Sequence, residues 1–162
     1  MTIPVASTSY THIQFRRFSG CQICNTHIAE LRRRKAQLDA AGIHEVLFFS
    51  LIARGCAAFH SDLPFDGVGD REKHYYRQLG VESSWSFVSP SANPGRLGQH
   101  FARQLRVDGN GWSVGLPAEF LLEPDGRIKA AHHGKHAYDQ WSVEILLWTL
   151  REIRGSAVSD CS

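Results

Sequence analysis

Cys21-Gln22-Ile23-Cys24 stands between a strand-like stretch, Tyr10–Phe18, and a helical pattern that begins near Asn25. Backbone N–H groups at a helix start and the positive end of the helix dipole favour thiolate over thiol, so a CxxC pair in such a position typically has one lowered pKa. Two intervening residues also let the two thiols meet as a disulfide. The four residues therefore predict a reversible redox pair.

Length and charge narrow the class of protein. The chain has 162 residues, 43% of them hydrophobic, which suits one domain better than two. We expect a single domain over residues 1–154 and a disordered tail over residues 155–162. The net charge of +2 is nearly balanced, and the basic residues are scattered apart from Arg32–Lys35. This pattern does not favour nucleic acid as a partner.

The first ten residues hold neither a basic region nor an apolar core of the kind found in a secretory signal. No segment reaches the roughly 18 consecutive apolar residues that a membrane span needs. We therefore expect a cytoplasmic protein without membrane contact. Four cysteines are too few for a disulfide scaffold, and a reducing compartment favours a catalytic or metal-binding role for the CxxC pair.

The first half of the chain predicts a βαβ unit. Alternation of polar and apolar residues predicts a half-buried strand within residues 10–18, and helical spacing predicts a helix over Ile23–Ala41 that Gly42 ends. The β-rich run Ile43–Leu51 follows directly. A strand, a long helix and a second strand in this order predict two parallel strands joined by a right-handed connection.

The second half predicts shorter elements. We expect a short strand within residues 63–70, a helix over residues 71–79, an irregular crossover over 81–115 with a short helix at 97–105, a hairpin of 118–122 and 127–133, and a helix over 140–154. Asp139 is the expected N-cap of that last helix. Its expected apolar face comprises Trp141, Ile145, Leu147 and Trp148. With a CxxC at the first strand–helix junction, this order predicts a thioredoxin-like α/β fold with a mixed central sheet and helices on both faces.

Three segments carry a family resemblance: Phe15–Cys24, Leu116–Ile128 and His132–Leu147. Together they resemble the peroxiredoxin-like branch of the alkyl hydroperoxide reductase/thiol-specific antioxidant (AhpC/TSA) group of the thioredoxin superfamily. The resemblance extends over about residues 13–150, and Gly69–Val81 adds to it. It implies a thioredoxin-like fold and thiol redox chemistry, and it allows a homodimer.

Two positions depart from the peroxiredoxin pattern. Peroxiredoxins carry a Thr three residues before the peroxidatic Cys and an Arg just before the strand of the hairpin, and both polarise the peroxide. Here these positions hold Cys21 and Pro117. Thioredoxins instead place a cis-proline opposite their CxxC. The resemblance therefore implies a cis Leu116–Pro117 bond whose Leu116 backbone pairs with an extended substrate.

The favoured hypothesis is a thiol–disulfide oxidoreductase in which Cys21 attacks a disulfide and Cys24 resolves the mixed disulfide. Leu116, Pro117 and Arg17 are the expected substrate-binding residues. Arg16 and Arg17 flank the site, where either one stabilises a thiolate or guides an acidic partner, while one of them faces solvent as the polar side of the strand. The expected partners are a protein or small-molecule disulfide and an external thiol reductant, without cofactor or metal.

Three alternatives remain open. In a thiol peroxidase, peroxide oxidises Cys24 to a sulfenic acid and Cys21 resolves it. A non-catalytic redox sensor or binding module would use the pair to control a partner. A zinc site would combine Cys21, Cys24, Cys56 and His60, with His27 as an alternative ligand. Cys56 is otherwise a packed residue or a resolving cysteine, and His132, His133 and His136 have poor spacing for a metal site.

Overall fold

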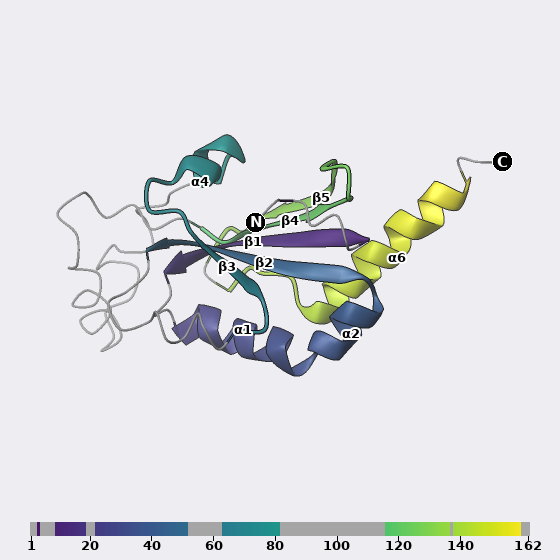
Figure 1. Ribbon diagram of the computed structural model, residues 1–162, viewed down its shortest axis with the longest axis horizontal. Helices are drawn as coiled ribbons and strands as arrows, with labels where there is room; N and C mark the ends of the chain where they lie inside the picture. Colours follow the sequence, from purple (N-terminus) through teal and green to yellow (C-terminus); the bar gives the residue numbers. More distant parts are fainter. Residues whose placement is uncertain are drawn as a thin grey trace.

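The computed structural model describes residue 3 and residues 9–18, 22–51, 63–81, 116–136 and 138–159. In these ranges one five-stranded sheet has the order β3-β2-β1-β4-β5 (Figure 1). Its strands are β1 (Tyr10–Phe18), β2 (Ile43–Leu51), β3 (Asp66–Gly69), β4 (Ala118–Leu122) and β5 (Ile128–His133). The helices are α1 (Gln22–Arg33), α2 (Lys35–Ala40), α4 (His74–Gln78) and α6 (Val143–Ser159). None of the helices in these ranges combines the length and the apolar composition that a bilayer crossing needs.

The sheet is mixed, as expected. Strands β1, β2 and β3 are parallel to one another, and β4 runs antiparallel to both β1 and β5. Helices α1, α2 and α6 cover one face of the sheet, and α4 lies over the other (Figure 1). The parallel β1–β2 pair, the β4–β5 hairpin and the thioredoxin-like arrangement that the sequence predicted are confirmed.

The first helical segment differs from the prediction. Residues 23–41 were expected to form one helix, but α1 and α2 are separated at Arg34, whose φ and ψ are −105° and 15°. The Arg34 N–H is shared between the carbonyls of Glu30 and Leu31, at 3.1 and 3.2 Å, as is common where a helix tightens or ends. Leu31 and Leu38 are both buried and lie seven residues apart, close to two helical turns. Because this spacing keeps the same face, the apolar pattern does not reveal the break.

Gly42 ends the second helix as predicted. Its φ is +73°, a conformation that a side chain disfavours, and its N–H donates to the carbonyl of Asp39 at 2.9 Å. Tyr10 N–H donates to the carbonyl of Gly42 at 3.0 Å. The end of α2 is thereby joined to the start of β1.

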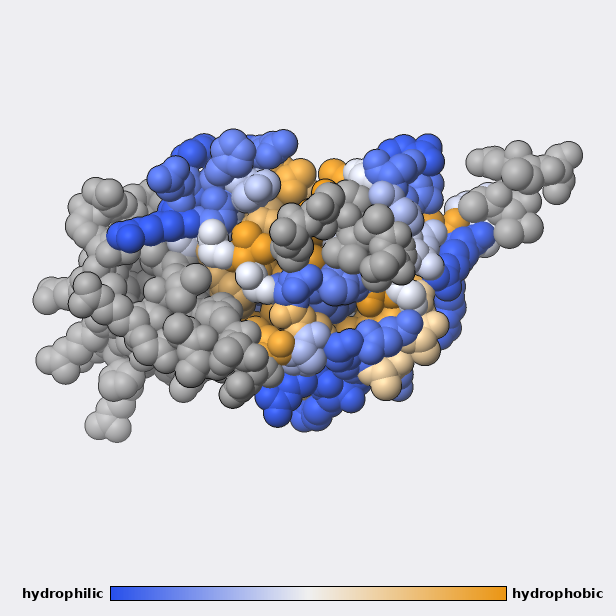
Figure 2. Space-filling model, viewed as in Figure 1, coloured by the Kyte–Doolittle hydropathy of each residue, from blue (hydrophilic) through white to orange (hydrophobic). Residues whose placement is uncertain are grey.

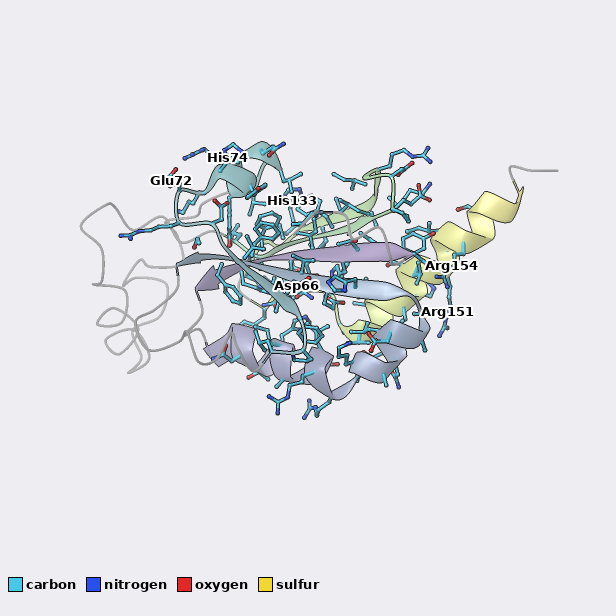
Figure 3. The ribbon with its side chains drawn as sticks, viewed as in Figure 1. Asp66, Glu72, His74, His133, Arg151 and Arg154 are labelled. Carbon is cyan, nitrogen blue, oxygen red and sulfur yellow. The ribbon has the colours of Figure 1, made fainter. Side chains whose placement is uncertain are left out.

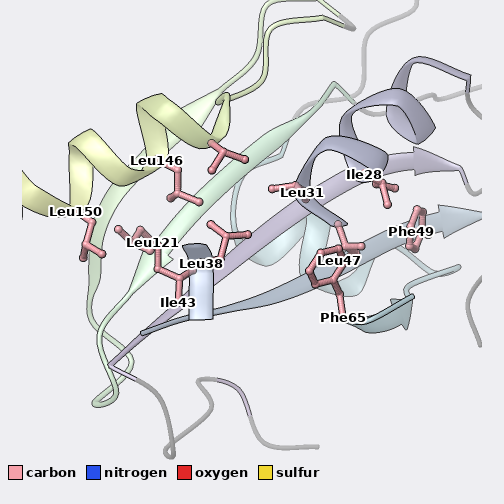
Figure 4. Packing of buried hydrophobic residues seen from close by; sticks show 11 residues of the cluster. Ile28, Leu31, Leu38, Ile43, Leu47, Phe49, Phe65, Leu121, Leu146 and Leu150 are labelled. Atoms are coloured by element: carbon pink, nitrogen blue, oxygen red, sulfur yellow. The ribbon is translucent and has the colours of Figure 1, made fainter. Parts of the chain in front are cut away.

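Two hydrophobic clusters lie on opposite faces of the sheet. The cluster beneath α1, α2 and α6 fills the space between these helices and the strands (Figure 4). Its buried members are Ile28, Leu31, Leu38, Ile43, Leu47, Phe49, Phe65, Leu121, Val143, Leu146 and Leu150. The cluster on the α4 face comprises Ile13, Phe15, Val46, Phe48, Tyr76, Val81, Ala118, Phe120 and Leu122. Hydrophilic residues lie on the outer sides of the helices, and hydrophobic residues are visible between the helices and the sheet (Figure 2).

The helix α4 is shorter than the predicted 71–79 and is held at its start by Asp70. The buried Asp70 carboxylate accepts hydrogen bonds from the N–H groups of His74, Tyr75 and Tyr76, at 2.8, 2.9 and 3.2 Å. These amides have no partner within a helix, so a carboxylate at this end stabilises it. The expected helix at 97–105 lies outside the described residues, as do Cys56, His60 and Cys161.

The last helix corrects three predictions. Asp139 is not its N-cap: α6 begins at Val143, and the Ser142 side chain accepts from the Ile145 N–H at 3.3 Å. The buried face comprises Val143, Leu146 and Leu150, whereas Ile145 and Trp148 are 45% and 59% exposed. The predicted phase was wrong because the pattern was counted from Trp141, which precedes the helix.

The predicted tail was also wrong in part, because α6 continues through residues 155–159. The Ser156 hydroxyl donates to the carbonyls of Glu152 and Ile153, both at 3.0 Å. Gly155 is exposed and weakens a helix by only about 1 kcal/mol relative to alanine. One glycine was therefore a poor stop signal.

Replacing glycine by alanine should have opposite effects on the free energy of unfolding at Gly155 and at Gly134. A Cβ at Gly155 would meet no atom within 4 Å, so Gly155→Ala should raise the free energy of unfolding by about 0.5–1 kcal/mol. A Cβ at Gly134 would lie 2.4 Å from the Asp139 carbonyl oxygen and 2.8 Å from Pro117 Cγ. Gly134→Ala should therefore lower that free energy by about 1–3 kcal/mol. Urea denaturation of the two variants measures both, and changes of the same sign would contradict this account of the packing.

Candidate active site at the start of α1

The structure brings the predicted site segments to one end of the sheet. Cys24 lies in the first turn of α1, six residues after β1 ends at Phe18, and Cys21 falls outside the described residues. Arg17 belongs to β1, and its side chain is not among those described. The predicted roles of Cys21, Cys24 and Arg17 therefore stay predictions.

Leu116 and Pro117 lie immediately before β4. Phe15 of β1 pairs with Ala118 of β4, so Pro117 is the next residue beside Arg16, toward the end of β1 that leads to α1. Pro117 is buried, and its carbonyl accepts the N–H of Gly134 at 2.8 Å. The structure thus places Pro117 near the start of α1, and the cis bond stays a prediction.

A row of buried polar side chains on the α1 face of the sheet was missed by sequence reasoning. The alternation in β1 indicated a half-buried strand with His12, Gln14 and Arg16 on its polar side. All three are at most 1% exposed, because β1 is a central strand covered on both faces. Glu45 and Glu119 join them, at 2% and 0% exposed. Three polar residues at every second position, in a strand expected at the centre of a sheet, are the signal that could have revealed this row.

Arg16 and Glu119 form one end of the row. Arg16 Nη2 donates to Glu119 Oε1 at 2.9 Å, and neither side chain is exposed. The guanidinium also donates to the side-chain oxygens of Gln14 and Gln140. The other oxygen of Glu119 accepts the Trp141 N–H at 2.5 Å. A buried ion pair needs such additional hydrogen bonds to offset the loss of water, and here β1, β4 and the approach to α6 supply them.

His12 and Glu45 form the other end. His12 Nδ1 lies 2.9 Å from Glu45 Oε2, and the Gln14 amide donates to the same oxygen at 2.5 Å. Gln14 thereby links the two carboxylates, because its oxygen accepts from Arg16. The Trp141 ring stacks on the imidazole of His12 at 5.8 Å. The row is one connected network across β2, β1 and β4.

His27 connects this network to α1. Its Nε2 lies 4.0 Å from Glu119 Oε1, the oxygen that Arg16 contacts, and its side chain is 11% exposed. Burial, followed by the positive charge of Arg16 and a contribution from His12, lowers the pKa of His27 from 6.5 to about 3. His27 is therefore neutral at physiological pH, one helical turn after Cys24.

Several buried polar atoms near this point have no hydrogen-bond partner among the described residues. They are His12 Nε2, Arg16 Nε, Asn25 Oδ1 and His27 Nε2. Buried polar groups are satisfied in the large majority of cases, and each exception calls for an explanation, such as a catalytic role, an ordered water or strain. Three of the four belong to α1 or to the residue beside Pro117. The start of α1 is therefore the candidate active site.

The described residues offer no group of three or more His, Cys, Asp or Glu side chains suited to a metal ion. His132 pairs with Asp139 at 2.8 Å, and His136 is exposed. His133 lies on the side of the sheet away from α1, where its ring packs against Phe120 at 5.4 Å (Figure 3). The three histidines thus lie in different environments and do not form one cluster. The zinc alternative depends on Cys21, Cys56 and His60, which lie outside the described ranges.

Several solved structures with the same arrangement are peroxiredoxins. A cysteine-to-serine mutant of peroxiredoxin 6 from Arenicola marina matches 92% of this chain and 63% of its own, with 10% identity and a TM-score of 0.64. The peroxidoxin BcpB of Mycobacterium tuberculosis matches with 14% identity, 92% and 82% coverage and a TM-score of 0.65. The chain has the peroxiredoxin fold. Peroxiredoxin Q of Xanthomonas campestris agrees, with 14% identity, 96% and 84% coverage and a TM-score of 0.63.

The sequence alone finds no such relative: no family model and no curated protein matches the chain. At 10–14% identity the likeness concerns the fold. This chain spans just under two thirds of the length of the peroxiredoxin 6 structure. The resemblance to a peroxiredoxin-like thioredoxin fold is confirmed, and the role of the CxxC pair belongs to the proposal below.

The lowered pKa of His27 predicts a pH dependence of stability. The unfolded chain binds a proton at His27 near pH 6.5, and the folded protein does so only near pH 3, so protonation favours unfolding within this window. The free energy of unfolding should therefore fall as pH drops below about 6.5. Compared with His27→Gln, the wild type should lose up to about 1.4 kcal/mol more per pH unit.

Urea denaturation between pH 7 and pH 4 measures this difference. His74→Gln, at an exposed position on α4, is the matched control for loss of an imidazole from the surface (Figure 3). Parallel pH profiles for wild type and His27→Gln would show that His27 is not held neutral by its surroundings.

Proposed function

We propose that this protein is a thiol peroxidase of the peroxiredoxin type, with Cys24 as the thiol that attacks the peroxide. The observation that carries the proposal is the position of Cys24, in the first turn of α1 directly after the central strand of a peroxiredoxin fold. The similar bacterioferritin comigratory protein of Xanthomonas campestris is described with alkyl peroxide reduction activity. These comparisons favour the peroxidase alternative over the disulfide oxidoreductase that the sequence favoured.

The chemistry needs two thiols and no cofactor. The Cys24 thiolate attacks one peroxide oxygen, so that an S–O bond forms while the O–O bond breaks. Cys24 becomes a sulfenic acid, and the departing alkoxide takes up a proton and leaves as an alcohol. The Cys21 thiol then attacks the sulfenic sulfur, which releases water and forms the Cys21–Cys24 disulfide. An external thiol returns both cysteines to the reduced state.

The start of α1 suits this first step. A helix of 12 residues presents unpaired N–H groups and positive potential at its first turn, and these stabilise a thiolate. The sheet beneath that turn carries a buried guanidinium at Arg16. His27 is held neutral, so it adds no charge to this effect. The surroundings described here therefore favour the attacking form of Cys24.

A thiol–disulfide oxidoreductase is the second candidate, and Pro117 favours it. Pro117 is buried beside the end of β1. It occupies the position at which the peroxiredoxin pattern has an arginine. In this mechanism Cys21 attacks the disulfide and Cys24 resolves, so the two cysteines exchange roles. The remaining proposed features are common to both candidates: a cytoplasmic protein, an external thiol as reductant and a homodimer, without nucleic acid.

Serine variants separate the two candidates. Stopped-flow oxidation by hydrogen peroxide, and by an alkyl hydroperoxide, should proceed in Cys21→Ser at a rate near that of the wild type. In Cys24→Ser it should fall to that of an ordinary free thiol, a loss of at least about 100-fold. Cys56→Ser and Cys161→Ser are the matched controls for loss of a thiol elsewhere in the chain.

Slow peroxide oxidation of the wild type, together with fast disulfide exchange that Cys21→Ser abolishes, would contradict the peroxidase proposal. Multiple turnovers with an added reductant distinguish either enzyme from a redox sensor, which changes state once per oxidation event.

A further inference from the structure

The outer face of α6 carries two large apolar side chains that face solvent. Ile145 is 45% exposed and Trp148 is 59% exposed, whereas Val143, Leu146 and Leu150 on the opposite face are buried. Residues three apart on a helix are neighbours, so Ile145 and Trp148 lie side by side. A surface helix usually has polar residues on the face turned away from the core. This face of α6 therefore departs from the usual pattern at its centre.

The exposed positions on this face follow a seven-residue repeat. Ile145, Trp148, Glu152 and Gly155 are all exposed and are separated by three, four and three residues. This is the spacing of the seam along which two helices pair. A Cβ at Gly155 would meet no atom within 4 Å, so a second backbone can approach closely there. We call these four positions the α6 seam.

The C-terminal part of α6 projects past the end of the sheet (Figure 1). Helical turns that do not pack against other elements are marginal in water. Gly155 lowers their helix propensity further, by about 1 kcal/mol relative to alanine. A second helix laid along the α6 seam would give these turns a packing partner.

One flank of the α6 seam carries two opposite charges. Glu144 and Arg151 are both exposed and lie seven residues apart, so they are on the same side of the helix. The Glu144 carboxylate contacts Arg34, yet its side chain remains 65% exposed. The opposite flank holds the uncharged Thr149 and Ser156. The charged flank is thus acidic near the start of the helix and basic near its middle.

An antiparallel pair of α6 helices matches these charges. When Ile145 of one copy lies level with Trp148 of the other, the same flanks of the two helices face each other. Glu144 then lies only about 3 Å, measured along the helix axis, from the level of Arg151 in the second copy. The pairing occurs twice in a two-fold arrangement. The flank is therefore complementary to a second copy of itself.

A parallel pair does not match the charges. It would place Glu152 of the α6 seam directly opposite Glu152 of the second copy, and like charges at such positions are destabilising. The antiparallel pair separates these two carboxylates by about 16 Å along the axis. It also brings each Glu152 level with the start of the other helix, where the helix dipole favours a negative charge.

We propose that the α6 seam binds a second copy of this chain in an antiparallel, two-fold pair. Two Ile145–Trp148 contacts form its centre, and two Glu144–Arg151 ion pairs flank it. Tryptophan is among the residues that contribute most to protein interfaces. Because one helix from each copy makes the contact, the pair belongs with small interfaces whose assembly depends on concentration. The interface goes beyond the peroxidase proposal and does not depend on it.

Sedimentation equilibrium of the full chain, over about a 100-fold range of concentration, tests the seam. A reducing agent in the buffer prevents disulfides between copies. The wild type should dimerise, and Ile145→Lys should weaken the dimer about 10-fold or more, because the charge enters the centre twice. Ile128→Lys on β5 is the matched control: the same substitution, at a residue 46% exposed, should leave the dimer unchanged.

Charge reversal tests the antiparallel arrangement. Glu144→Arg and Arg151→Glu should each weaken self-association, because the facing flanks then carry like charges. An equal mixture of the two variants should associate at least about 5-fold more tightly than either does alone. The variant with both substitutions should recover the wild-type affinity. Both positions are exposed, so these variants keep the test decisive even where Ile145→Lys alters the helix.

Weakening by Ile145→Lys but not by Ile128→Lys, together with preferential association of the mixed charge variants, supports the proposal. A protein that stays monomeric at every concentration overturns it, as does a dimer that Ile128→Lys weakens and Ile145→Lys does not. Charge variants that associate no better mixed than alone overturn it as well. Ile145→Lys should react with peroxide at the wild-type rate, so failure of the dimer and failure of the peroxidase proposal are separate results.

Discussion

The ion pair between Arg16 and Glu119 is the contact on which the arrangement of this molecule depends. It joins β1 to β4 on the face beneath α1, and neither side chain meets solvent. A buried charge without its partner is costly, so loss of either side chain alone should weaken the packing of β1 against β4. The bonds from Gln140 and Trp141 extend the constraint to the segment that leads into α6. One pair therefore connects two strands and the segment that precedes the last helix.

Much of the fold could be predicted from local sequence patterns. The boundaries of β1, β2 and β4 follow from alternation and from β-rich runs, and Gly42 and the 123–126 turn mark where the chain reverses. The break between α1 and α2 at Arg34 and the buried face of α6 could not be predicted from the sequence. Leu31 and Leu38 keep one face through the break, and Trp141 shows the apolar character of a helical residue while lying before the helix. Such features depend on tertiary contacts that the local pattern does not encode.

Only those residues of the candidate site that belong to local sequence motifs could be predicted. CxxC spacing located Cys21 and Cys24, and hairpin signals located Leu116 and Pro117. The polar network beneath them was not found, since Glu45 and Glu119 read as ordinary strand residues until β2 and β4 are seen on either side of β1. The alternation of His12, Gln14 and Arg16 indicated exposure, whereas Gln140 and Trp141, which help to bury them, come from a distant part of the sequence. Burial of a central strand is a property of the whole sheet.

The span of the Arg16 contacts has a consequence for synthesis of the chain. Its partners Glu119 and Gln140 lie 103 and 124 residues later. A growing chain that has completed β1, α1 and β2 holds the guanidinium on a sheet face whose counter-charge has not yet been made. Sheets that depend on such distant contacts fold slowly and expose unpaired edges meanwhile. The N-terminal βαβ unit is therefore an incomplete folding unit, and the protein commits to its native state only when its last quarter has left the ribosome.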